Sequence, residues 1–210
     1  MYRLYTRPST AGMAPHILLH EIGAPHELVA LDKDAGALTA PDYAKLNPHA
    51  RVPTLVEGDL VIYEATAICL HLADRHPEAG LAPALGSDER ARFYQWMAFL
   101  TNSVQADEMI WFYPERFAPE SEAAAVRAKI TDRLAQMFAV LDKAVAGRQW
   151  LAGDRFGAAD AYLFMLARWT RNMPRKARDL PYLGPYLARV LDRPSVRAMI
   201  AAEGLSEPFY

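Results

Sequence analysis

A valine–proline pair stands directly before a predicted strand, in the segment Asn47-Pro48-His49-Ala50-Arg51-Val52-Pro53-Thr54-Leu55-Val56. A proline is tolerated at the first residue of a strand, and X-Pro bonds are the only peptide bonds whose cis form is cheap. A cis Val52–Pro53 bond would turn the Val52 backbone N–H and C=O away from the sheet, free to pair with an extended peptide. An ordinary loop proline that only packs fits this segment equally well.

A second candidate binding segment follows about ten residues after the first, where a predicted strand ends and a predicted helix begins, at Glu64 and Ala65. The N-terminus of a helix presents free N–H groups and a partial positive charge, which favour a bound carboxylate. Glu64 is acidic at the same place and can hold a ligand ammonium. Taken alone, Glu64 is better explained as a residue that caps the helix.

Other residues with metal-binding or redox chemistry give weaker signals. His16 and His20 are spaced i and i+4 on a predicted helix, but no third ligand stands at a recognisable spacing. We therefore predict a surface pair and no metal site. Cys69 is the single cysteine, which excludes a disulfide within the chain and a cysteine-built zinc site.

The first third of the chain alternates short strands with helices. A strand, a helix stopped by Gly23, a second strand and a hairpin turning at Gly58-Asp59 precede another helix that ends before Pro77. The predicted ranges are strands at Tyr2–Thr6, Glu27–Leu31, Thr54–Glu57 and Leu60–Tyr63, helices from Pro15 to Ile22 and from Ala65, and one or two helical turns within Pro41–Leu46. This order predicts one parallel and one antiparallel pairing in a small α/β sheet.

Every strong signal in the rest of the chain is helical. Residues 78–87 are rich in Ala, Gly and Pro and are predicted to be a linker. Apolar stripes at helical spacing follow, among them Phe93, Met97, Leu100 and Val104, then a long stripe from Val126 to Val145 and another from Tyr162 to Trp169. We predict an α/β domain at residues 1–77 and an all-helical domain at residues 88–210.

Composition narrows the functional classes. Of the 210 residues, 52% are hydrophobic and 23% charged, and the formal net charge of -2 gives no reason to expect nucleic acid as a partner. No apolar run reaches the roughly 20 residues that a membrane span needs, and the first residues lack the plan of a secretory signal. The expectation is a cytoplasmic protein without a membrane partner.

The two polar segments together are far more specific than either alone. The pattern Asn-Pro … Val-Pro-x-Leu … Glu-x-x-Ala-Ile is similar to the glutathione-binding half of glutathione transferases. Tyr2-Arg3-Leu4-Tyr5 followed by Ala14-Pro15-His16-Ile17 resembles the first strand and helix of the bacterial beta class. Leu151-Ala152-Gly153-Asp154-Arg155-Phe156 with Asp160 resembles the folding motif of the family's C-terminal domain. The resemblance implies a thioredoxin-like N-terminal domain and an all-α C-terminal domain.

The resemblance also implies a role for particular residues. The Val52 backbone, next to Pro53, would bind the cysteinyl part of glutathione. Glu64 would bind the γ-glutamyl ammonium, and the Ala65 N–H, with the Thr66 hydroxyl, would bind the γ-glutamyl carboxylate. Arg51 would reach the glycyl carboxylate, although a solvated loop arginine is an equal alternative. The implied partners are glutathione, a hydrophobic electrophile and a second copy of the chain, because a homodimer is the family's usual state.

Three departures from the family pattern bear on the chemistry. The cysteine that the beta class carries in the first loop is Ala11 here, a common serine is Ala65, and the usual Ser or Thr cap of the C-terminal motif is Gly157. A glycine cap costs only a few tenths of a kcal/mol.

The remaining candidates to activate the glutathione thiol are hydroxyls, in the order Ser9, Thr10 and Tyr5. The alternative role of Ser9 and Thr10 is turn formation and helix capping. The predicted function is conjugation of glutathione to an apolar electrophile. A non-catalytic glutathione-binding protein and a glutathione-dependent isomerase or dehalogenase are the alternatives.

Overall fold

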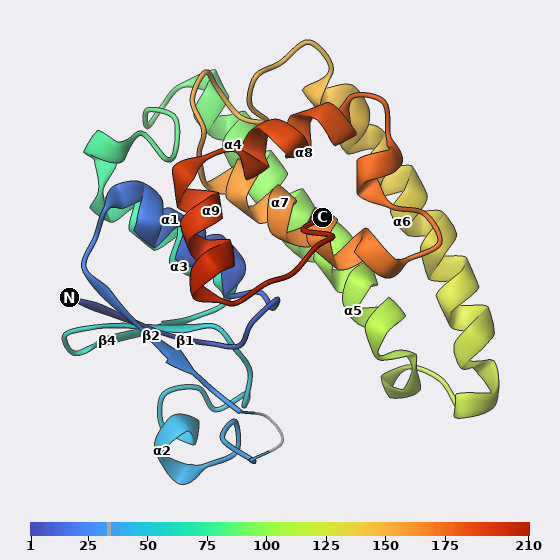
Figure 1. Cartoon of the computed structure of the whole chain (residues 1–210), viewed down its shortest axis with the longest axis horizontal. Helices are drawn as coiled ribbons and strands as arrows, with labels where there is room; N and C mark the ends of the chain where they lie inside the picture. Colours follow the sequence, from blue (N-terminus) through green and yellow to red (C-terminus); the bar gives the residue numbers. More distant parts are fainter. Residues whose placement is uncertain (33–34) are drawn as a thin grey trace.

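A four-stranded sheet forms the first part of the molecule in the computed structural model, which describes residues 1–32 and 35–210. The strands are β1 (Tyr2–Thr6), β2 (His26–Ala30), β3 (Thr54–Glu57) and β4 (Leu60–Tyr63), in the order β2-β1-β3-β4. β1 pairs parallel with β2 and antiparallel with β3, and β3 and β4 form the hairpin (Figure 1). The predicted pairing is confirmed, with the second strand beginning one residue earlier than expected.

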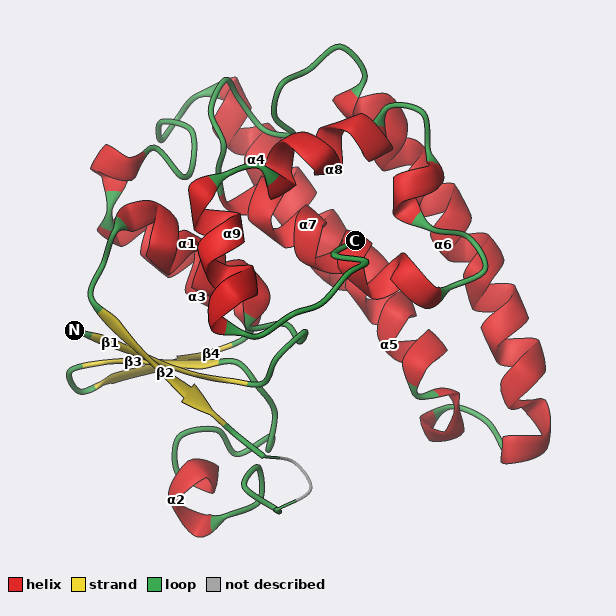
Figure 2. Cartoon of the chain, viewed as in Figure 1, coloured by secondary structure: helices red, strands yellow, loops and turns green. Residues whose placement is uncertain are grey.

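Three helices flank this sheet. α1 (Met13–Ile22) and α3 (Ala65–Arg75) cover one face, and the short α2 (Pro41–Ala44) lies on the other side (Figure 2). Pro15 lies in the first turn of α1, where its missing N–H breaks no helical hydrogen bond. Gly23 ends α1 in the left-handed conformation, with φ 69°, which glycine adopts without steric cost.

All the regular secondary structure in the remainder of the described chain is helical. The bounds of the helices are α4 (Asp88–Phe99), a π-helical segment (Leu100–Gln105), α5 (Ala106–Phe112), α6 (Ala123–Val145), α7 (Ala158–Trp169), α8 (Leu183–Leu191) and α9 (Pro194–Ala202). The fold predicted from the sequence, a thioredoxin-like α/β part followed by a helical part, is confirmed. The domain limits at residues 77 and 88 stay a prediction. Among the described residues, no helix combines the length and apolarity that crossing a bilayer requires.

The two parts share a core around α7, all of whose residues are buried. α1 packs against α7 and also against α9, so the last helix of the chain lies beside the first (Figure 1). This packing places the loop before α1 next to residues near the C-terminus.

Position 157, at the start of α7, requires glycine because the Leu81 backbone carbonyl lies close to it. The Leu81 carbonyl accepts a hydrogen bond from the Ala158 N–H at 2.8 Å, and a Cβ on Gly157 would lie 2.4 Å from that carbonyl oxygen. The Asp160 carboxylate accepts from the N–H groups of Leu151 and Gly157 and performs the capping. We expected Gly157 to be a slightly weaker substitute for a Ser or Thr cap. That expectation is wrong, because in this backbone a larger residue meets Leu81.

Candidate functional site

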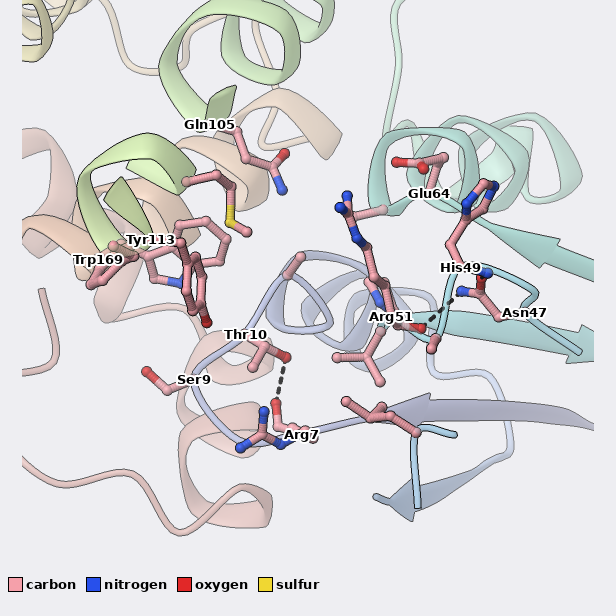
Figure 3. A pocket seen from close by; sticks show the side chains of 18 of the residues that line it. Arg7, Ser9, Thr10, Asn47, His49, Arg51, Glu64, Gln105, Tyr113 and Trp169 are labelled. Carbon is pink, nitrogen blue, oxygen red and sulfur yellow. Dashed lines mark hydrogen bonds between the residues drawn. The ribbon is translucent and has the colours of Figure 1, made fainter. Parts of the chain in front are cut away.

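A cleft of about 670 Å³ lies where the sheet meets the helical part (Figure 3). One side comes from the loop after β1, the loop before β3 and the first residues of α3, and the other from α5 and the end of α7. It is lined by Arg7, Ser9, Thr10, Ala11, Leu38, Asn47, His49, Ala50, Arg51, Val52, Pro53, Glu64, Ala65, Gln105, Met109, Phe112, Tyr113, Arg116, Trp169 and Arg171.

The Val52 backbone is presented to the cleft by a firmly held loop. Val52–Pro53 is a cis bond, as one of the two sequence interpretations predicts. The Arg51 carbonyl accepts from Asn47 Nδ2 at 2.8 Å and from the Tyr43 hydroxyl at 2.5 Å, and both side chains also bond the Thr54 hydroxyl. Within residues 1–32 and 35–210 the Val52 N–H and C=O have no hydrogen-bond partner. They are therefore available to an extended ligand.

The start of α3 faces the same space. Glu64 is its N-cap, with φ 73° in the left-handed region that a non-glycine residue rarely occupies. Its exposed carboxylate makes no hydrogen bond or ion pair with the part of the chain that the structure describes. Ala65 begins the helix, and the first helical bond runs from the Ile68 N–H to the Glu64 carbonyl at 3.0 Å. The N–H groups before Ile68 are thus free to bind an anion.

The charge of the lining is mostly positive. Four arginines, Arg7, Arg51, Arg116 and Arg171, surround the cleft together with one carboxylate, Glu64. Figure 3 shows the Arg51 side chain extending toward the Glu64 end. This balance suits a ligand with more carboxylates than ammonium groups.

Ser9 is held from two directions by the helical part. Its N–H donates to Glu203 Oε2 at 3.0 Å, and its hydroxyl oxygen accepts from Arg168 Nε at 3.0 Å. Burial, with a smaller contribution from the nearby Arg171, lowers the pKa of Arg168 to about 10, so this guanidinium stays charged at neutral pH. The Ser9 hydroxyl hydrogen is donated to no group in the described part of the chain. The Thr10 hydroxyl, in contrast, donates to the Arg7 carbonyl at 2.6 Å.

Comparison with known proteins agrees with this arrangement. Residues 1–74 match the model of the glutathione S-transferase N-terminal domain, and residues 124–193 match that of the C-terminal domain. The chain is 34% identical over 209 residues to glutathione S-transferase GST-4.5 of Xanthomonas campestris pv. campestris, covering 97% of this chain and 100% of that protein. The chain belongs to the glutathione S-transferase family.

Two further relatives of this transferase support the assignment. Glutathione S-transferase GstA of Escherichia coli O157:H7 is 30% identical over 205 residues, covering 97% of this chain and 99% of that protein. The structure of a sphingomonad glutathione S-transferase complexed with glutathione superimposes with a TM-score of 0.84 at 33% identity, covering 97% of this chain and 100% of that one. These similarities confirm the predicted family and enzyme class, including glutathione as the thiol substrate or cofactor of that class.

Not every predicted site residue of this transferase lines the cleft. Ser9, Thr10, Arg51, Val52, Pro53, Glu64 and Ala65 do so. The Tyr5 ring instead packs against Tyr43, with 5.6 Å between ring centroids, and the Thr66 hydroxyl is hydrogen-bonded to the Thr101 hydroxyl. The roles proposed for these residues stay predictions. Cys69 is fully buried, and burial raises the pKa of its thiol, so the sole cysteine is remote from the cleft chemistry.

Aromatic side chains of the helical part supply the apolar wall. Phe112 and Tyr113 line the cleft together with Met109 and Trp169. Trp96 and Trp111 are not among the lining residues, and Trp111 donates to the Thr131 hydroxyl at 3.1 Å. The π-helical segment ends at Gln105, which accepts from the Tyr162 hydroxyl and also faces the cleft.

Sequence reasoning missed the residues that support the site from behind. Asn47 and Tyr43 brace the Val52 loop, and Asn47 already stands in the motif that identified it. Arg168 and Glu203 hold Ser9 from more than 150 positions away, and no local pattern marks them. The predicted surface pair of His16 and His20 is also wrong, because α9 covers His16, which is 1% exposed and pairs with Glu203.

Proposed function

We propose that this transferase binds glutathione, extended along the cleft, and conjugates its sulfur to an apolar electrophile. The observation that carries the proposal is that the unpaired Val52 backbone and the free N-terminus of α3 lie in the same cleft. An extended peptide can pair with the Val52 N–H and C=O, while its terminal carboxylate binds the N–H groups at the start of α3. Glutathione has one ammonium and two carboxylates, which matches the single acid and four arginines of the lining.

In the proposed orientation each residue has the role that the family resemblance implies. Glu64 binds the γ-glutamyl ammonium, and the Ala65 N–H binds the γ-glutamyl carboxylate. The cysteinyl residue pairs with the Val52 backbone. The Arg51 side chain, which extends toward the Glu64 end in Figure 3, turns to bind the glycyl carboxylate. This places the sulfur toward the loop before α1, with the aromatic wall of Phe112, Tyr113 and Trp169 on the far side of the cleft.

Conjugation needs the thiolate, since the thiol is a poor nucleophile. The thiol proton passes to solvent, the sulfur lone pair forms a bond to the electrophilic carbon, and the leaving group departs with its electron pair. Lowering the thiol pKa by two units takes about 2.7 kcal/mol of preferential stabilisation of the thiolate. A hydroxyl donor in the loop before α1 and the N-terminus of that helix together stabilise a thiolate by about this amount.

Calorimetry with glutathione tests the binding half of the proposal. Glu64→Gln keeps the size of the side chain but leaves the ligand ammonium without an anionic partner, so affinity should fall by at least about tenfold. Glu89→Gln, an exposed glutamate on α4, is the matched control and should bind like the wild type. The absence of heat from wild-type protein at millimolar glutathione would rule out the proposed site.

A panel of electrophiles tests the catalytic half. The replacement of the beta-class cysteine by Ala11, and of a common serine by Ala65, favours one rival function, a glutathione-binding protein without turnover. Binding of glutathione with no conjugation of any electrophile in the panel would support the rival. Conjugation at neutral pH would support the transferase.

We also propose that the protein is a homodimer. Several apolar side chains are exposed on the edge strand β4 and on α4, namely Leu60, Val61, Tyr63 and Tyr94. Exposed apolar surface of this kind is what symmetric association buries.

A further inference from the structure

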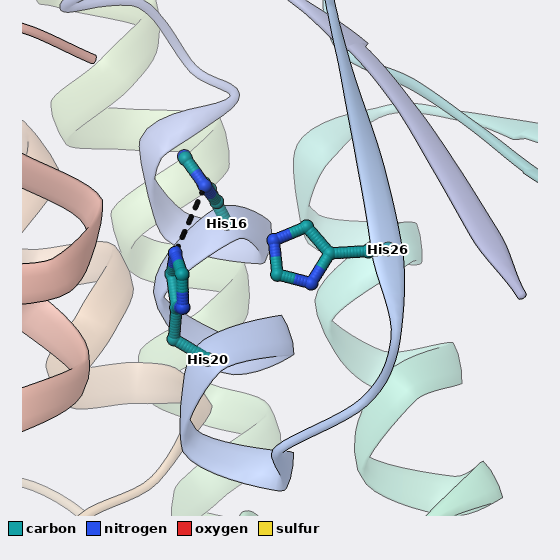
Figure 4. Close-up of side chains that lie close together, drawn as sticks. All are labelled: His16, His20 and His26. Atoms are coloured by element: carbon teal, nitrogen blue, oxygen red, sulfur yellow. Dashed lines mark hydrogen bonds between the residues drawn. The ribbon is translucent and has the colours of Figure 1, made fainter. Parts of the chain in front are cut away.

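Three of the six histidines of the chain converge at one place outside the cleft. His16 and His20 lie on α1, and His26 opens β2, which runs beside that helix (Figure 4). One ring nitrogen from each lies within 4.8 Å of the others, and the Nε2 atoms of His16 and His20 are 3.1 Å apart. The spacing of His16 and His20 suggested only a pair, and the sheet brings in the third imidazole.

We infer that His16, His20 and His26 form a binding site for a divalent transition-metal ion, with zinc the best match. Three imidazoles with a fourth position left to water form a common zinc arrangement. Without an ion the three rings share a single hydrogen bond, between His16 and His20. A bound metal would use all three nitrogens at once.

The partners of the other ring nitrogens support this assignment. His16 Nδ1 lies 3.0 Å from Glu203 Oε1, so its N–H donates to the carboxylate and the lone pair on Nε2 points into the cluster. His26 Nδ1 donates to the Ala24 carbonyl at 2.8 Å, which likewise leaves Nε2 as the ligand atom. A carboxylate or carbonyl that accepts from the outer nitrogen fixes the tautomer and orientation of a metal-binding histidine.

His20 is the member that must adjust. Its Nε2 hydrogen donates to His16 in the absence of a metal, and moving that hydrogen to Nδ1 frees Nε2 for an ion. The uncharged imidazole is the form that binds metals.

Small side-chain rotations would bring the three ring nitrogens to the separations of a tetrahedral zinc site. In a tetrahedral zinc site with Zn–N bonds near 2.1 Å, the nitrogens are about 3.4 Å apart. The widest separation here, up to 4.8 Å, must shorten by roughly 1.4 Å to reach that tetrahedral geometry. His20 and His26 are half-buried, so they can rotate and leave the fourth position to water, whereas His16 is fixed by Glu203.

The test uses the full untagged chain, stripped of metal and free of glutathione, whose thiol binds zinc itself. Zn²⁺ should raise the melting temperature, and Co²⁺ should give the visible absorption of a tetrahedral site. His20→Ala and His26→Ala should each weaken the affinity for both ions by at least about tenfold, since each removes one ligand. His71→Ala, on α3 and paired with Glu57, is the matched control and should behave like the wild type.

Two results would overturn the site. One is a wild-type protein whose melting temperature and Co²⁺ spectrum do not respond. The other is a response that His20→Ala and His26→Ala leave unchanged. Should those variants fail to fold, histidine modification by diethyl pyrocarbonate on the wild type decides: Zn²⁺ must protect His20 and His26 while the exposed His49 stays reactive, and equal labelling with and without Zn²⁺ refutes the proposal.

Discussion

Ser9 and Thr10 are neighbours in one loop, yet their hydroxyls have different hydrogen-bonding states. The Ser9 oxygen accepts from the charged Arg168, which polarises the hydroxyl and leaves its hydrogen free. The Thr10 hydrogen is already donated to the Arg7 carbonyl. A thiolate needs a donor, so Ser9 suits the role better than Thr10, and Tyr5 is outside the cleft lining.

Ser9→Ala should raise the pKa of the bound glutathione thiol by about one unit, because one hydrogen bond to the thiolate is lost. The ultraviolet absorbance of the thiolate, followed against pH, measures this shift. Affinity for glutathione should change little, since the peptide is held elsewhere. Thr10→Val is the control and should titrate like the wild type. If only Tyr5→Phe shifts the titration, Tyr5 is the donor instead.

Asp160 shows how a buried acid makes stability depend on pH. Burial raises its pKa to about 6 from 3.8, although the N–H groups of Leu151 and Gly157 and the Tyr186 hydroxyl all donate to it. The folded state therefore holds the proton more tightly than the unfolded state. This contribution is fully present below pH 3.8 and is lost as the pH rises through 6, a change of about 3 kcal/mol.

Asp160→Asn should remove that dependence. The free energy of unfolding of the wild type minus that of the variant should fall by about 2.4 kcal/mol between pH 4 and pH 7. Urea denaturation at several pH values measures it. Asp192→Asn, an exposed acid at the end of α8, should give a difference that is nearly flat. A flat difference for Asp160→Asn as well would mean that its pKa is not raised.

Helices and strands were predictable where local patterns suffice. The hairpin follows from Gly58-Asp59 between two short apolar runs, and α6 from its long stripe at helical spacing. The stripe from Phe93 to Val104 is buried as expected, but it runs from α4 into a π-helical segment, which periodicity does not distinguish. Local patterns also do not say which face another element covers, and so the burial of His16 under α9 was missed.

Gly157→Ala should destabilise the protein through the start of α7. The added Cβ meets the Leu81 carbonyl, a backbone group that moves only with its loop, so we expect a loss of about 2 kcal/mol or more in the free energy of unfolding. Gly23→Ala is the comparison, because its φ of 69° carries a conformational cost but its Cβ meets nothing within 4 Å. Chemical denaturation should rank Gly157→Ala as the costlier change, and the opposite order would contradict the steric argument.

The candidate site is assembled from both ends of the chain. Its ligand-facing half, from Val52 to Glu64, stands in one continuous motif and could be found in the sequence. The supports Arg168 and Glu203 could not, since only the packing of α7 and α9 on α1 brings them to Ser9. The sequence ordered Ser9, Thr10 and Tyr5 by their place in the chain alone, and these contacts add the hydrogen-bonding state of the Ser9 hydroxyl.

The exposed apolar side chains on β4 and α4 predict that two copies of the chain associate into a dimer. We expect light scattering at micromolar concentration to give twice the mass of one chain, because a stable symmetric interface buries roughly 1,600 Å² of largely apolar surface. Tyr94 on α4 is 46% exposed and stacks under the Arg90 guanidinium, a rigid aromatic of the kind that anchors interfaces. Tyr94→Glu removes this aromatic anchor and brings a hydrated charge into the interface, so it should shift the protein to monomers. Val140→Glu, on α6 with a side chain 51% exposed, is the matched control and should remain dimeric. A monomeric wild type would contradict the dimer, and dissociation by Val140→Glu alone would move the interface to α6.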